Sequence, residues 1–324
     1  PKCSILTPSH SPADTSDYSY SPFWVRTYRN NLVSHPTVTV IVLNWCKEEE
    51  TTECLRSILG SEYTNLSILL VDNGSPDDSG ERVRAAFPGI GFLQTGKNLG
   101  YASGNNRGIE RALESATDYI LILNNDTVLD PDAVSQLVST AEEGDRKVGG
   151  VVPKLLYYDE PQRIWYAGGA FSALHGLGLH WRQGDLDQPD LKESVKEVTF
   201  MTGACCLISV RALRELGGFD EDFFAYVEDA DLSLRMNKAG YQMYYQPEAR
   251  VLHRSPPPGT PPSPFQIRQR DLNRRRIMSK HASLGQRLLF LARFAITRVL
   301  LFLGYTFKGD LQRALAILQG LGKD

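Results

Sequence analysis

Apolar and polar positions follow two different periods along the chain from Val38 onwards. Short apolar runs typical of buried strands occupy residues 38–43, 66–71, 90–95 and 118–123. Stretches with helical spacing lie between them, at residues 48–60, 80–87 and 103–116. This repetition of strand, helix and strand with short connections predicts an α/β fold, in which helices cover both faces of a mostly parallel sheet.

The second half of the chain continues with strands and a short helix. The segments 148–156 and 200–210 are apolar and predict strands, while 211–218 predicts a helix that ends at its two glycines. The Gly- and aromatic-rich segment 165–181 has neither period over most of its length. We therefore expect this segment to pack over the edge of the sheet as a loop wall.

Composition divides the 324 residues into four parts. Residues 1–36 are rich in Ser, Pro and Tyr, which predicts a partly disordered arm without the pattern of a signal peptide. Residues 37–255 form the α/β domain, whose core is supported by a hydrophobic content of 42% for the chain. The Pro-rich segment 256–264 is expected to be a linker or lid, and residues 265–324 a basic amphipathic helical tail.

The formal net charge of −3 conceals a strong asymmetry between the tail and the rest. Residues 265–324 carry 12 Lys+Arg and 3 Asp+Glu, whereas the remainder carries 23 and 35. A basic tail behind an acidic body predicts an anionic partner, such as phospholipid headgroups or a pyrophosphate.

Residues 288–307 within the tail are long enough to cross a bilayer, but Arg293 and Arg298 interrupt the apolar run. Arginines are costly at the bilayer centre, so a helix in the membrane interface with both arginines at the headgroups is favoured over a spanning one. Residues 268–307 are then expected to contact an anionic membrane surface, with Arg274, Arg275 and Arg276 near the phosphates of an acceptor. Packing on the α/β domain or in a homodimer is the alternative.

The number and spacing of the cysteines indicate the cell compartment of the protein. The five cysteines, Cys3, Cys46, Cys54, Cys205 and Cys206, are odd in number and contain no C-x-x-C pair. Adjacent cysteines such as the last two are poorly placed to bridge each other. This usage favours a reducing, cytoplasmic setting, and the basic tail favours a peripheral position at the inner face of the cell membrane.

Polar clusters follow each of the first four predicted strands. They are Asn44, the segment 72–75 (DNGS), the segment 97–100 (KNLG) and the segment 124–126 (NND). Each cluster alone is more readily explained as an Asx turn or a helix cap. Ligands of parallel sheets bind beyond the carboxyl ends of the strands, so four clusters at one edge predict a binding site there.

Further acidic and histidine side chains complete a candidate site. Glu228, Asp229 and Asp231 fall at the predicted start of a helix, where carboxylates either stabilise the helix dipole or include a general base. His253 ends another apolar run. Together with Asp126, it could supply nitrogen and oxygen ligands to one divalent ion, whose remaining ligands would be phosphate and water.

The chain from Val38 to about Ser255 resembles the family 2 inverting glycosyltransferases of the GT-A fold, and among them the bacterial rhamnosyltransferase-like members. The matching segments, in the family's order, are VIVLNW, LLVDNGSPDDS, KNLGYASGNNRGI, LILNNDTVLDP, GGFDEDFFAYVEDADLSLR and GYQMYYQPEARVLH. The resemblance implies transfer of a sugar from a nucleoside diphosphate sugar to a hydroxyl of a glycan or lipid-linked glycan, with inversion, in cell-surface glycan synthesis.

The resemblance also implies a role for single residues in donor binding. Asp72 is expected to read the nucleotide base, and the pocket around the donor is expected to be shaped by Asn44, Asn98, Gly100 and Asn125.

For catalysis, the resemblance implies that Asp229 is the base, with Glu228 beside it. Asp126 matches the metal-binding residue of the family's D-x-D motif, and His253 matches a second ligand of Mg²⁺ or Mn²⁺. The first Asp of the motif is replaced by Asn124, which removes one carboxylate from the metal site and leaves strict metal dependence open.

Two other classes of protein remain as alternatives. A sugar nucleotidyltransferase shares the sheet, but its Gly-rich loop with a following basic residue is not found after the first strand, where residues 43–46 read LNWC. A non-catalytic protein that binds nucleotide sugars or glycans would not need Asp229 and His253 together. Nucleic acid is not an expected partner of any of these classes.

Overall fold

The structure is a computed structural model that describes residues 35–143, 147–188, 190 and 192–322. The predicted arm falls almost wholly on residues 1–34, which lie outside the described residues. The described strands are β1 (Val38–Asn44), β2 (Leu66–Asp72), β3 (Gly91–Gln94), β4 (Tyr119–Asn124), β5 (Thr127–Leu129), β6 (Val148–Tyr157), β7 (Ile164–Tyr166), β8 (Gly169–Ser172), β9 (Leu177–His180), β10 (Lys196–Val198), β11 (Cys205–Ser209) and β12 (Gln242–His253). The described helices are α1 (Glu48–Leu59), α2 (Ser79–Ala86), α3 (Gly100–Leu113), α4 (Ala133–Ala141), α5 (Val210–Leu216), α6 (Glu228–Lys238), α7 (Pro264–His281), α8 (Leu284–Phe307) and α9 (Leu311–Leu321).

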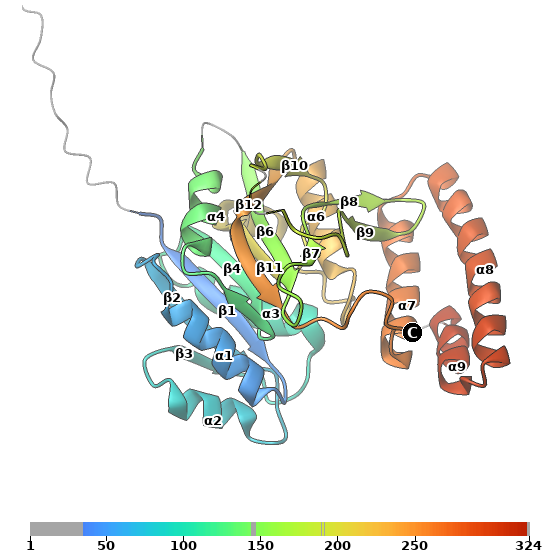
Figure 1. Ribbon diagram of the computed structural model, residues 1–324, viewed down its shortest axis with the longest axis horizontal. Coiled ribbons are helices and arrows are strands. Elements are labelled where there is room, and N and C mark those ends of the chain that lie inside the picture. Colours follow the sequence, from blue (N-terminus) through green and yellow to red (C-terminus); the bar gives the residue numbers. More distant parts are fainter. Residues whose placement is uncertain (1–34, 144–146, 189, 191, 323–324) are drawn as a thin grey trace, which may run out of the picture. The chain divides into compact units, whose positions relative to one another are not determined.

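One large sheet dominates the fold, with the strand order β10-β12-β6-β11-β4-β1-β2-β3 (Figure 1). Strands β3, β2, β1 and β4 are mutually parallel, whereas β11 runs antiparallel between β4 and β6. Asn44 lies opposite Asp72, and Leu43 lies opposite Asn124. The carboxyl ends of the three central strands therefore coincide, which brings the predicted polar clusters to one edge.

Both faces of the sheet are covered. Six of the seven residues of β1 and the four central residues of β4 are buried. Because successive side chains of a strand point to opposite faces, burial along the whole strand requires packing on each side. The predicted mostly parallel α/β sheet with a helical C-terminal region is confirmed.

The prediction that residues 165–181 form neither helix nor strand is wrong. The segment contains the end of β7 and the antiparallel pair of β8 and β9. A Cβ atom at Gly178 would lie 2.4 Å from the ring of Phe200, and one at Gly169 would lie 2.8 Å from it. These glycines leave room for an aromatic ring against the strands. They also interrupt the alternation of apolar and polar side chains by which a strand is recognised in a sequence, although the strands still form.

Helix α7 begins directly after the Pro-rich segment. The side chain of Ser263 accepts a hydrogen bond from the backbone N–H of Gln266, whose side chain in turn accepts one from the N–H of Ser263. Ser283 and Gln286 form the same arrangement at the start of α8. Such capping boxes define where the two helices begin, and α9 packs against both of them.

Candidate active site

A chain of hydrogen bonds joins the ends of the central strands. Asn125 Nδ2 donates to Thr51 Oγ1 at 2.8 Å, and Thr51 Oγ1 donates to Asn44 Oδ1 at 2.8 Å. Asn44 Nδ2 then donates to Asp72 Oδ1 at 2.8 Å. Asn44, Thr51 and Asp72 are almost completely buried. This series of hydrogen bonds fixes the relative positions of β1, β2 and β4 at the edge where the sheet ends.

Asp72 is fully engaged by protein groups in this conformation. Besides Asn44, its carboxylate accepts hydrogen bonds from Ser75 Oγ at 2.6 Å, from Ser75 N at 3.1 Å and from Gln94 Nε2 at 2.6 Å. The residue is 1% exposed. Its expected role as the reader of the nucleotide base stays a prediction, and that role requires one of these contacts to open.

Asn98 and Gly100 lie where the loop after β3 enters α3. Asn98 Oδ1 accepts from Gly100 N at 2.9 Å and from Asn73 Nδ2 at 3.2 Å. Gly100 has a φ of 82°, and a Cβ atom there would lie 2.4 Å from the carbonyl oxygen of Phe224. Only glycine allows this approach, which brings the start of α3 against the loop that precedes α6.

Tyr101 connects the same helix to the predicted base. Its backbone N–H donates to Phe224 O at 2.6 Å, and its hydroxyl donates to Gly203 O at 2.7 Å. Gly203 N donates in turn to Asp229 Oδ2 at 3.0 Å. Burial raises the pKa of Tyr101, and the charges of Glu228, Asp229 and Asp126 add to the rise. The hydroxyl of Tyr101 therefore lies within electrostatic range of the carboxylates of Asp229 and Asp126, which belong to the predicted base and the predicted metal site.

Asp229 and Glu228 occupy different environments at the start of α6. The carboxylate of Asp229 is oriented by two backbone groups, Gly203 N and Ala230 N, the latter at 2.8 Å. Glu228 is 5% exposed, and its Oε2 is buried without a hydrogen-bond partner among the described residues. Burial raises the pKa of both groups, and the charge of Asp229 raises that of Glu228 further. Burial and the charge of Asp229 favour the neutral form of Glu228. Asp229 is therefore the better placed of the two to accept a proton.

Asp126 and His253 lie next to each other, with Oδ1 and Nε2 separated by 3.3 Å. Asp126 Oδ1 is buried and has no hydrogen-bond partner in the described part of the chain. Two ligands in adjacent positions around Mg²⁺ or Mn²⁺ are separated by about 3 Å, so the pair fits a divalent cation. The described residues contain no group of three or more His, Cys, Asp or Glu side chains that could hold a metal. Two protein ligands would leave the other positions to phosphate oxygens and water.

The aromatic segment around β7 contacts this pair. The ring of Trp165 meets the ring of His253 edge to face, with centroids 4.4 Å apart. Trp165 Nε1 donates to Ser255 Oγ at 2.9 Å, which fixes the indole at the end of β12. The segment therefore lies beside the sheet edge as expected, although strands and not a loop carry it.

The turn before α6 has a strained backbone. Tyr226 and Val227 have φ values of 70° and 76°, a conformation that β-branched residues such as Val rarely adopt. Such strain costs on the order of 1–3 kcal/mol per residue and clusters at functional sites. Asn273 on α7 stabilises the turn, because its Nδ2 donates to Ala225 O at 2.9 Å and to Tyr226 O at 2.8 Å.

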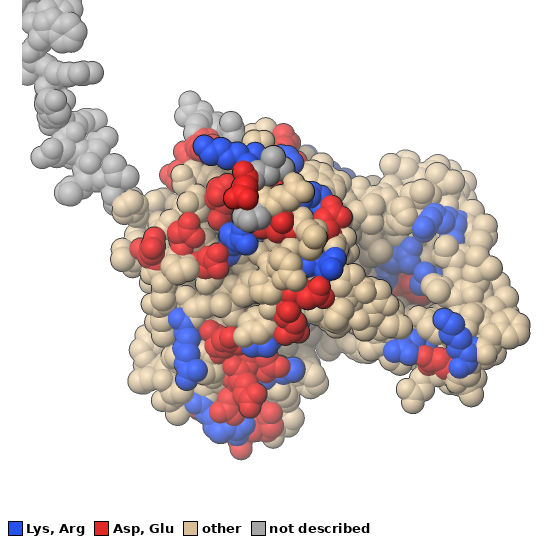
Figure 2. All heavy atoms as spheres, in the orientation of Figure 1, with Lys and Arg blue, Asp and Glu red and all other residues tan. Residues whose placement is uncertain are grey.

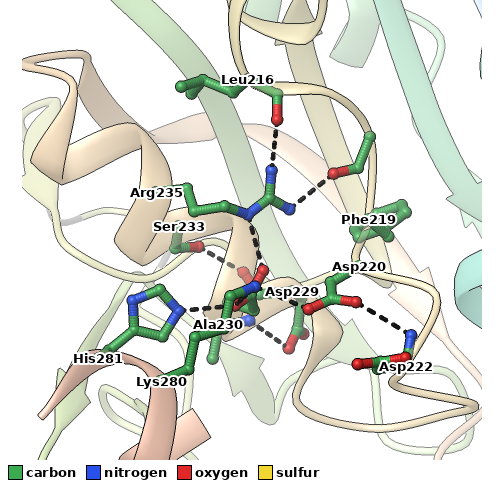
Figure 3. A network of polar contacts seen from close by, with 12 residues as sticks. Leu216, Phe219, Asp220, Asp222, Asp229, Ala230, Ser233, Arg235, Lys280 and His281 are labelled. Carbon is green, nitrogen blue, oxygen red and sulfur yellow. Dashed lines mark hydrogen bonds and ion pairs between the residues drawn. The ribbon is translucent and has the colours of Figure 1, made fainter.

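A buried ion network ties α7 to α6 a few residues further on (Figure 3). Asp231 is 0% exposed and accepts from Arg235 Nε and from Lys280 Nζ, each at 2.7 Å. Its Oδ1 lies 2.6 Å from His281 Nε2. Lys280 also donates to Asp220 Oδ2 at 2.7 Å. Helix α7 is thus an integral support of the start of α6, which carries the predicted base.

The three consecutive arginines of α7 do not form a free cationic patch. Arg274 Nε donates to His175 O at 2.7 Å, and Arg275 donates to the carbonyl oxygens of Gly320 and Gly322. Arg276 donates to Asp222 O. The expectation that all three lie near the phosphates of an acceptor stays a prediction, and each guanidinium already donates to an intramolecular carbonyl group.

Sequence reasoning did not single out Thr51, Tyr101, Gly203 or Asn273. Tyr101 lies inside the recognised segment KNLGYASGNNRGI, so its position was available from the motif. The other three act through contacts with residues that are distant in the chain, and such contacts leave no local pattern.

Comparison with solved structures identifies the fold. GalNAc-T7 with UDP, GalNAc and Mn²⁺ aligns with a TM-score of 0.59 at 17% identity, over 76% of this chain and 48% of that chain. The mannosyltransferase PcManGT from Pyrobaculum calidifontis in complex with GDP-Man and Mn²⁺ aligns with a TM-score of 0.54 at 15% identity, over 89% and 86%. At these identities the likeness concerns the fold alone, which is that of the GT-A glycosyltransferases.

Sequence comparison then gives the family. The family described as "Glycosyltransferase like family 2" matches residues 35–276, and the protein belongs to it. The N-acetylglucosaminyl-diphospho-decaprenol L-rhamnosyltransferase of Mycobacterium tuberculosis is 32% identical over 206 residues, which are 58% of this chain and 66% of that protein. The low-salt glycan biosynthesis hexosyltransferase Agl10 of Haloferax volcanii is 22% identical over 221 residues, 68% of this chain and 67% of the relative. The chain thus matches just under two thirds of the length of the mycobacterial protein.

The ion network of Asp231 predicts a pH-dependent stability. Burial alone would raise the pKa of Asp231, but the hydrogen bonds from His281 and Lys280 and the charge of Arg235 outweigh it and lower the pKa. A carboxylate with a lowered pKa stabilises the folded state above its unfolded pKa of about 3.9, and this stability is lost as the pH falls. We expect Asp231→Asn to reduce the free energy of unfolding near neutral pH by about 3–5 kcal/mol.

Urea unfolding of both proteins between pH 7 and pH 3 measures the effect. The difference between wild type and Asp231→Asn should shrink as the pH falls below about 5, because Asp231 of the unfolded wild type then binds a proton while the folded carboxylate stays ionised. Asp222→Asn, which changes an exposed carboxylate in the loop before α6, should leave the stability unchanged. A constant difference across the pH range would contradict the assigned role of the ion network.

Proposed function

We propose that the protein is an inverting glycosyltransferase that uses a nucleoside diphosphate sugar. The observation that carries the proposal is the oriented carboxylate of Asp229, which is joined through Gly203 and Tyr101 to the helix that starts at the donor edge. This arrangement supplies one base next to one nucleotide-type site. A single displacement needs no more than these two parts, and it inverts the anomeric centre.

The proposed step moves one proton and one sugar. The acceptor hydroxyl gives its proton to the carboxylate of Asp229 while its oxygen bonds to the anomeric carbon. The bond between that carbon and the phosphate oxygen breaks, and the nucleoside diphosphate leaves with the electron pair. Positive charge develops on the sugar ring as in glycoside hydrolysis. A divalent cation held by Asp126 and His253 would supply positive charge next to the departing diphosphate.

The sugar and the acceptor are proposed from the relatives. The mycobacterial protein is named as a rhamnosyltransferase that acts on a lipid-linked N-acetylglucosaminyl diphosphate. We accordingly propose rhamnose as the transferred sugar and a lipid-linked glycan of cell-surface synthesis as the acceptor. In the proposed donor site, Asn44, Asp72, Asn98, Gly100 and Asn125 form the edge that meets the nucleotide.

A membrane contact is proposed for the outer face of α8. This helix is long and apolar enough to cross a membrane by length and composition, and 11% of its apolar window is buried. Arg298 Nη1 donates to Asp271 Oδ1 at 2.6 Å, and Arg293 is half-buried. The expectation that these arginines reach headgroups is therefore wrong for Arg298, whose guanidinium is engaged with α7.

Between its exposed Arg287 and its C-terminal end, α8 presents an apolar outer face. Exposed side chains on this face and on α9 include Leu288, Leu289, Ile296, Val299, Leu300, Leu303, Leu311 and Leu315. The outer edge formed by α8 is correspondingly free of charged atoms in Figure 2. Exposed Arg287 and Lys308 flank the apolar stretch at its two ends, where they suit anionic headgroups. Since α7 and α9 cover the inner side, we propose that α8 lies in the interface and does not span the bilayer.

The role of Asp229 is tested by a conservative substitution. We expect Asp229→Asn to lower sugar transfer about 10²–10⁴-fold, the range typical of a general base, and to leave nucleotide affinity within a few fold. Because burial raises the pKa of Asp229, activity should fall with decreasing pH at a pH above the ordinary range of aspartate. Asp222→Asn, an exposed neighbour in the loop, is the matched control. A variant that retains more than about a tenth of wild-type turnover would show that Asp229 is not the base.

The metal pair is tested by binding. Calorimetry with UDP, GDP and dTDP should give tighter binding in Mn²⁺ or Mg²⁺ than in EDTA for at least one nucleotide. Asp126→Ala and His253→Ala should each lose this metal-dependent increment and bind as the wild type does in EDTA. Identical wild-type affinities with and without metal would rule the pair out as a cation site.

The membrane contact is tested by flotation with anionic vesicles at low salt. The full chain should float with the vesicles, and the double variant Ile296→Lys/Leu300→Lys should not, because it places two charges on the apolar face. Leu59→Lys/Leu186→Lys, at exposed leucines of the α/β domain, makes the same charge change and should float as the wild type does. A wild-type dimer without vesicles that Ile296→Lys/Leu300→Lys dissociates would assign the face to a second copy of the chain instead.

A further inference from the structure

A cavity of about 180 Å³ lies between α7, α8 and α9. Its apolar wall includes Ile267 from α7, Leu301 from α8 and Ile317 from α9. Complete pockets for small molecules usually measure about 300–1,000 Å³, so this cavity holds only part of a larger ligand.

Positive charge exceeds negative charge in the cavity. Three arginines line it, Arg270, Arg274 and Arg298, and Asp271 is the sole acid among the described lining residues. Asp271 Oδ1 lies 2.6 Å from Arg298 Nη1 and 3.5 Å from Arg274 Nη1. Asp271 Oδ2 and Arg298 Nε are buried without a hydrogen-bond partner in the described part of the chain. Arg274 is buried and Arg298 is half-buried, whereas Arg270 is exposed. Two cations withdrawn from water that share one counter-ion are costly, and an anion would offset that cost.

The pKa of Arg274 agrees with this excess of positive charge. Burial lowers the pKa of Arg274, and the charge of Arg298 lowers it further, to about 10. The carboxylate of Asp271 raises the pKa without restoring its ordinary value. One buried carboxylate is therefore insufficient for the guanidinium groups around it.

The cavity is connected to the candidate active site through Arg270. The guanidinium of Arg270 lies 5.0 Å from the centroid of the Tyr226 ring, in the strained turn directly before Glu228. The charge of Arg270 also lowers the pKa of Asp229, against the larger rise that burial causes. A ligand anion at Arg270 would therefore lie within electrostatic range of the proposed base.

The other side of the cavity leads to the apolar face of α8. Leu301 lines the cavity and is 41% exposed, and its neighbours Leu300 and Leu303 belong to the outer face. A long apolar chain that starts in the cavity can continue on this face without meeting a charge. An anionic group and an apolar chain in one ligand match the two sides of the cavity.

We propose that this cavity binds the phosphate end of a lipid phosphate, the phosphate or diphosphate ester of a long apolar alcohol. Arg270, Arg274 and Arg298 offset the phosphate charge, Ile267, Leu301 and Ile317 contact the first carbons of the chain, and the rest of the chain lies along α8. The inference rests on the proposed function, because the lipid phosphate would be the carrier of the acceptor glycan, which extends past Tyr226 to Asp229.

The experiment is calorimetry on the full chain in EDTA, with farnesyl diphosphate as the probe and with pyrophosphate and farnesol as its separate halves. Farnesyl diphosphate should bind more tightly than either half. Arg270→Gln should weaken its binding about tenfold, the loss expected for one charge-assisted hydrogen bond. Arg268→Gln removes the same charge from an exposed position two residues away that does not line the cavity, and it should bind as the wild type does.

Three results would overturn the proposal. Equal affinities for farnesyl diphosphate and pyrophosphate would show a simple anion site, and equal affinities for farnesyl diphosphate and farnesol would show an apolar site. Equal losses in Arg270→Gln and Arg268→Gln would show unspecific attraction to a basic helix. Loss of binding in Arg270→Gln alone, together with weak binding of both halves, would support it.

Hydrolysis of nucleotide sugars by the same preparations separates this inference from the proposed function. A protein that hydrolyses a donor but does not bind farnesyl diphosphate overturns the cavity assignment and leaves the transferase in place. A protein that binds farnesyl diphosphate in the arginine-dependent way but turns over no donor supports a lipid phosphate site, and the proposed transferase then fails.

Discussion

The contact of α7 with the turn at residues 225–227 and with the start of α6 is the interaction on which the rest of the candidate site depends. Val227 adopts a backbone conformation that a β-branched residue does not favour, and Asn273 provides two hydrogen bonds that help to offset its cost. Asp231, buried among Arg235, Lys280 and His281, anchors the helix that follows the turn. Residues 228 and 229 lie between these two anchors, so their backbone is held in place by a helix that begins more than thirty residues later.

This contact also explains why the C-terminal helices are not an independent appendage. Helix α7 uses one side to support the turn and another to form the cavity with α8 and α9. Most of α7 falls within the segment that matches the family, which ends at residue 276. The helices beyond it carry the exposed apolar side chains, so one continuous element joins the proposed base to the proposed membrane face.

Charge illustrates how tertiary contacts alter the meaning of composition. The tail is strongly basic, and that imbalance correctly indicates a surplus of cations in the C-terminal region. Yet Arg274, Arg275 and Arg276 donate to backbone carbonyl groups, and Arg298 donates to Asp271. Because long side chains can fold back on neighbouring helices, the number of arginines in a segment does not determine how many face a ligand. The charge that remains uncompensated lies in the cavity between α7, α8 and α9, where Arg274 and Arg298 share one carboxylate, that of Asp271.

The sequence by itself determined the strands and helices of the first half, the edge at which their polar residues gather, and the family. Periodicity and turn residues are local properties, and parallel strands bring their carboxyl ends together whatever the details of packing. The tertiary structure alone decided that Asp72 is engaged by four protein donors, that Gly203 orients Asp229, and that the glycines of β8 and β9 make room for Phe200. These facts depend on pairs of residues far apart in the chain, whose approach is set by packing and leaves no periodic signal in the sequence.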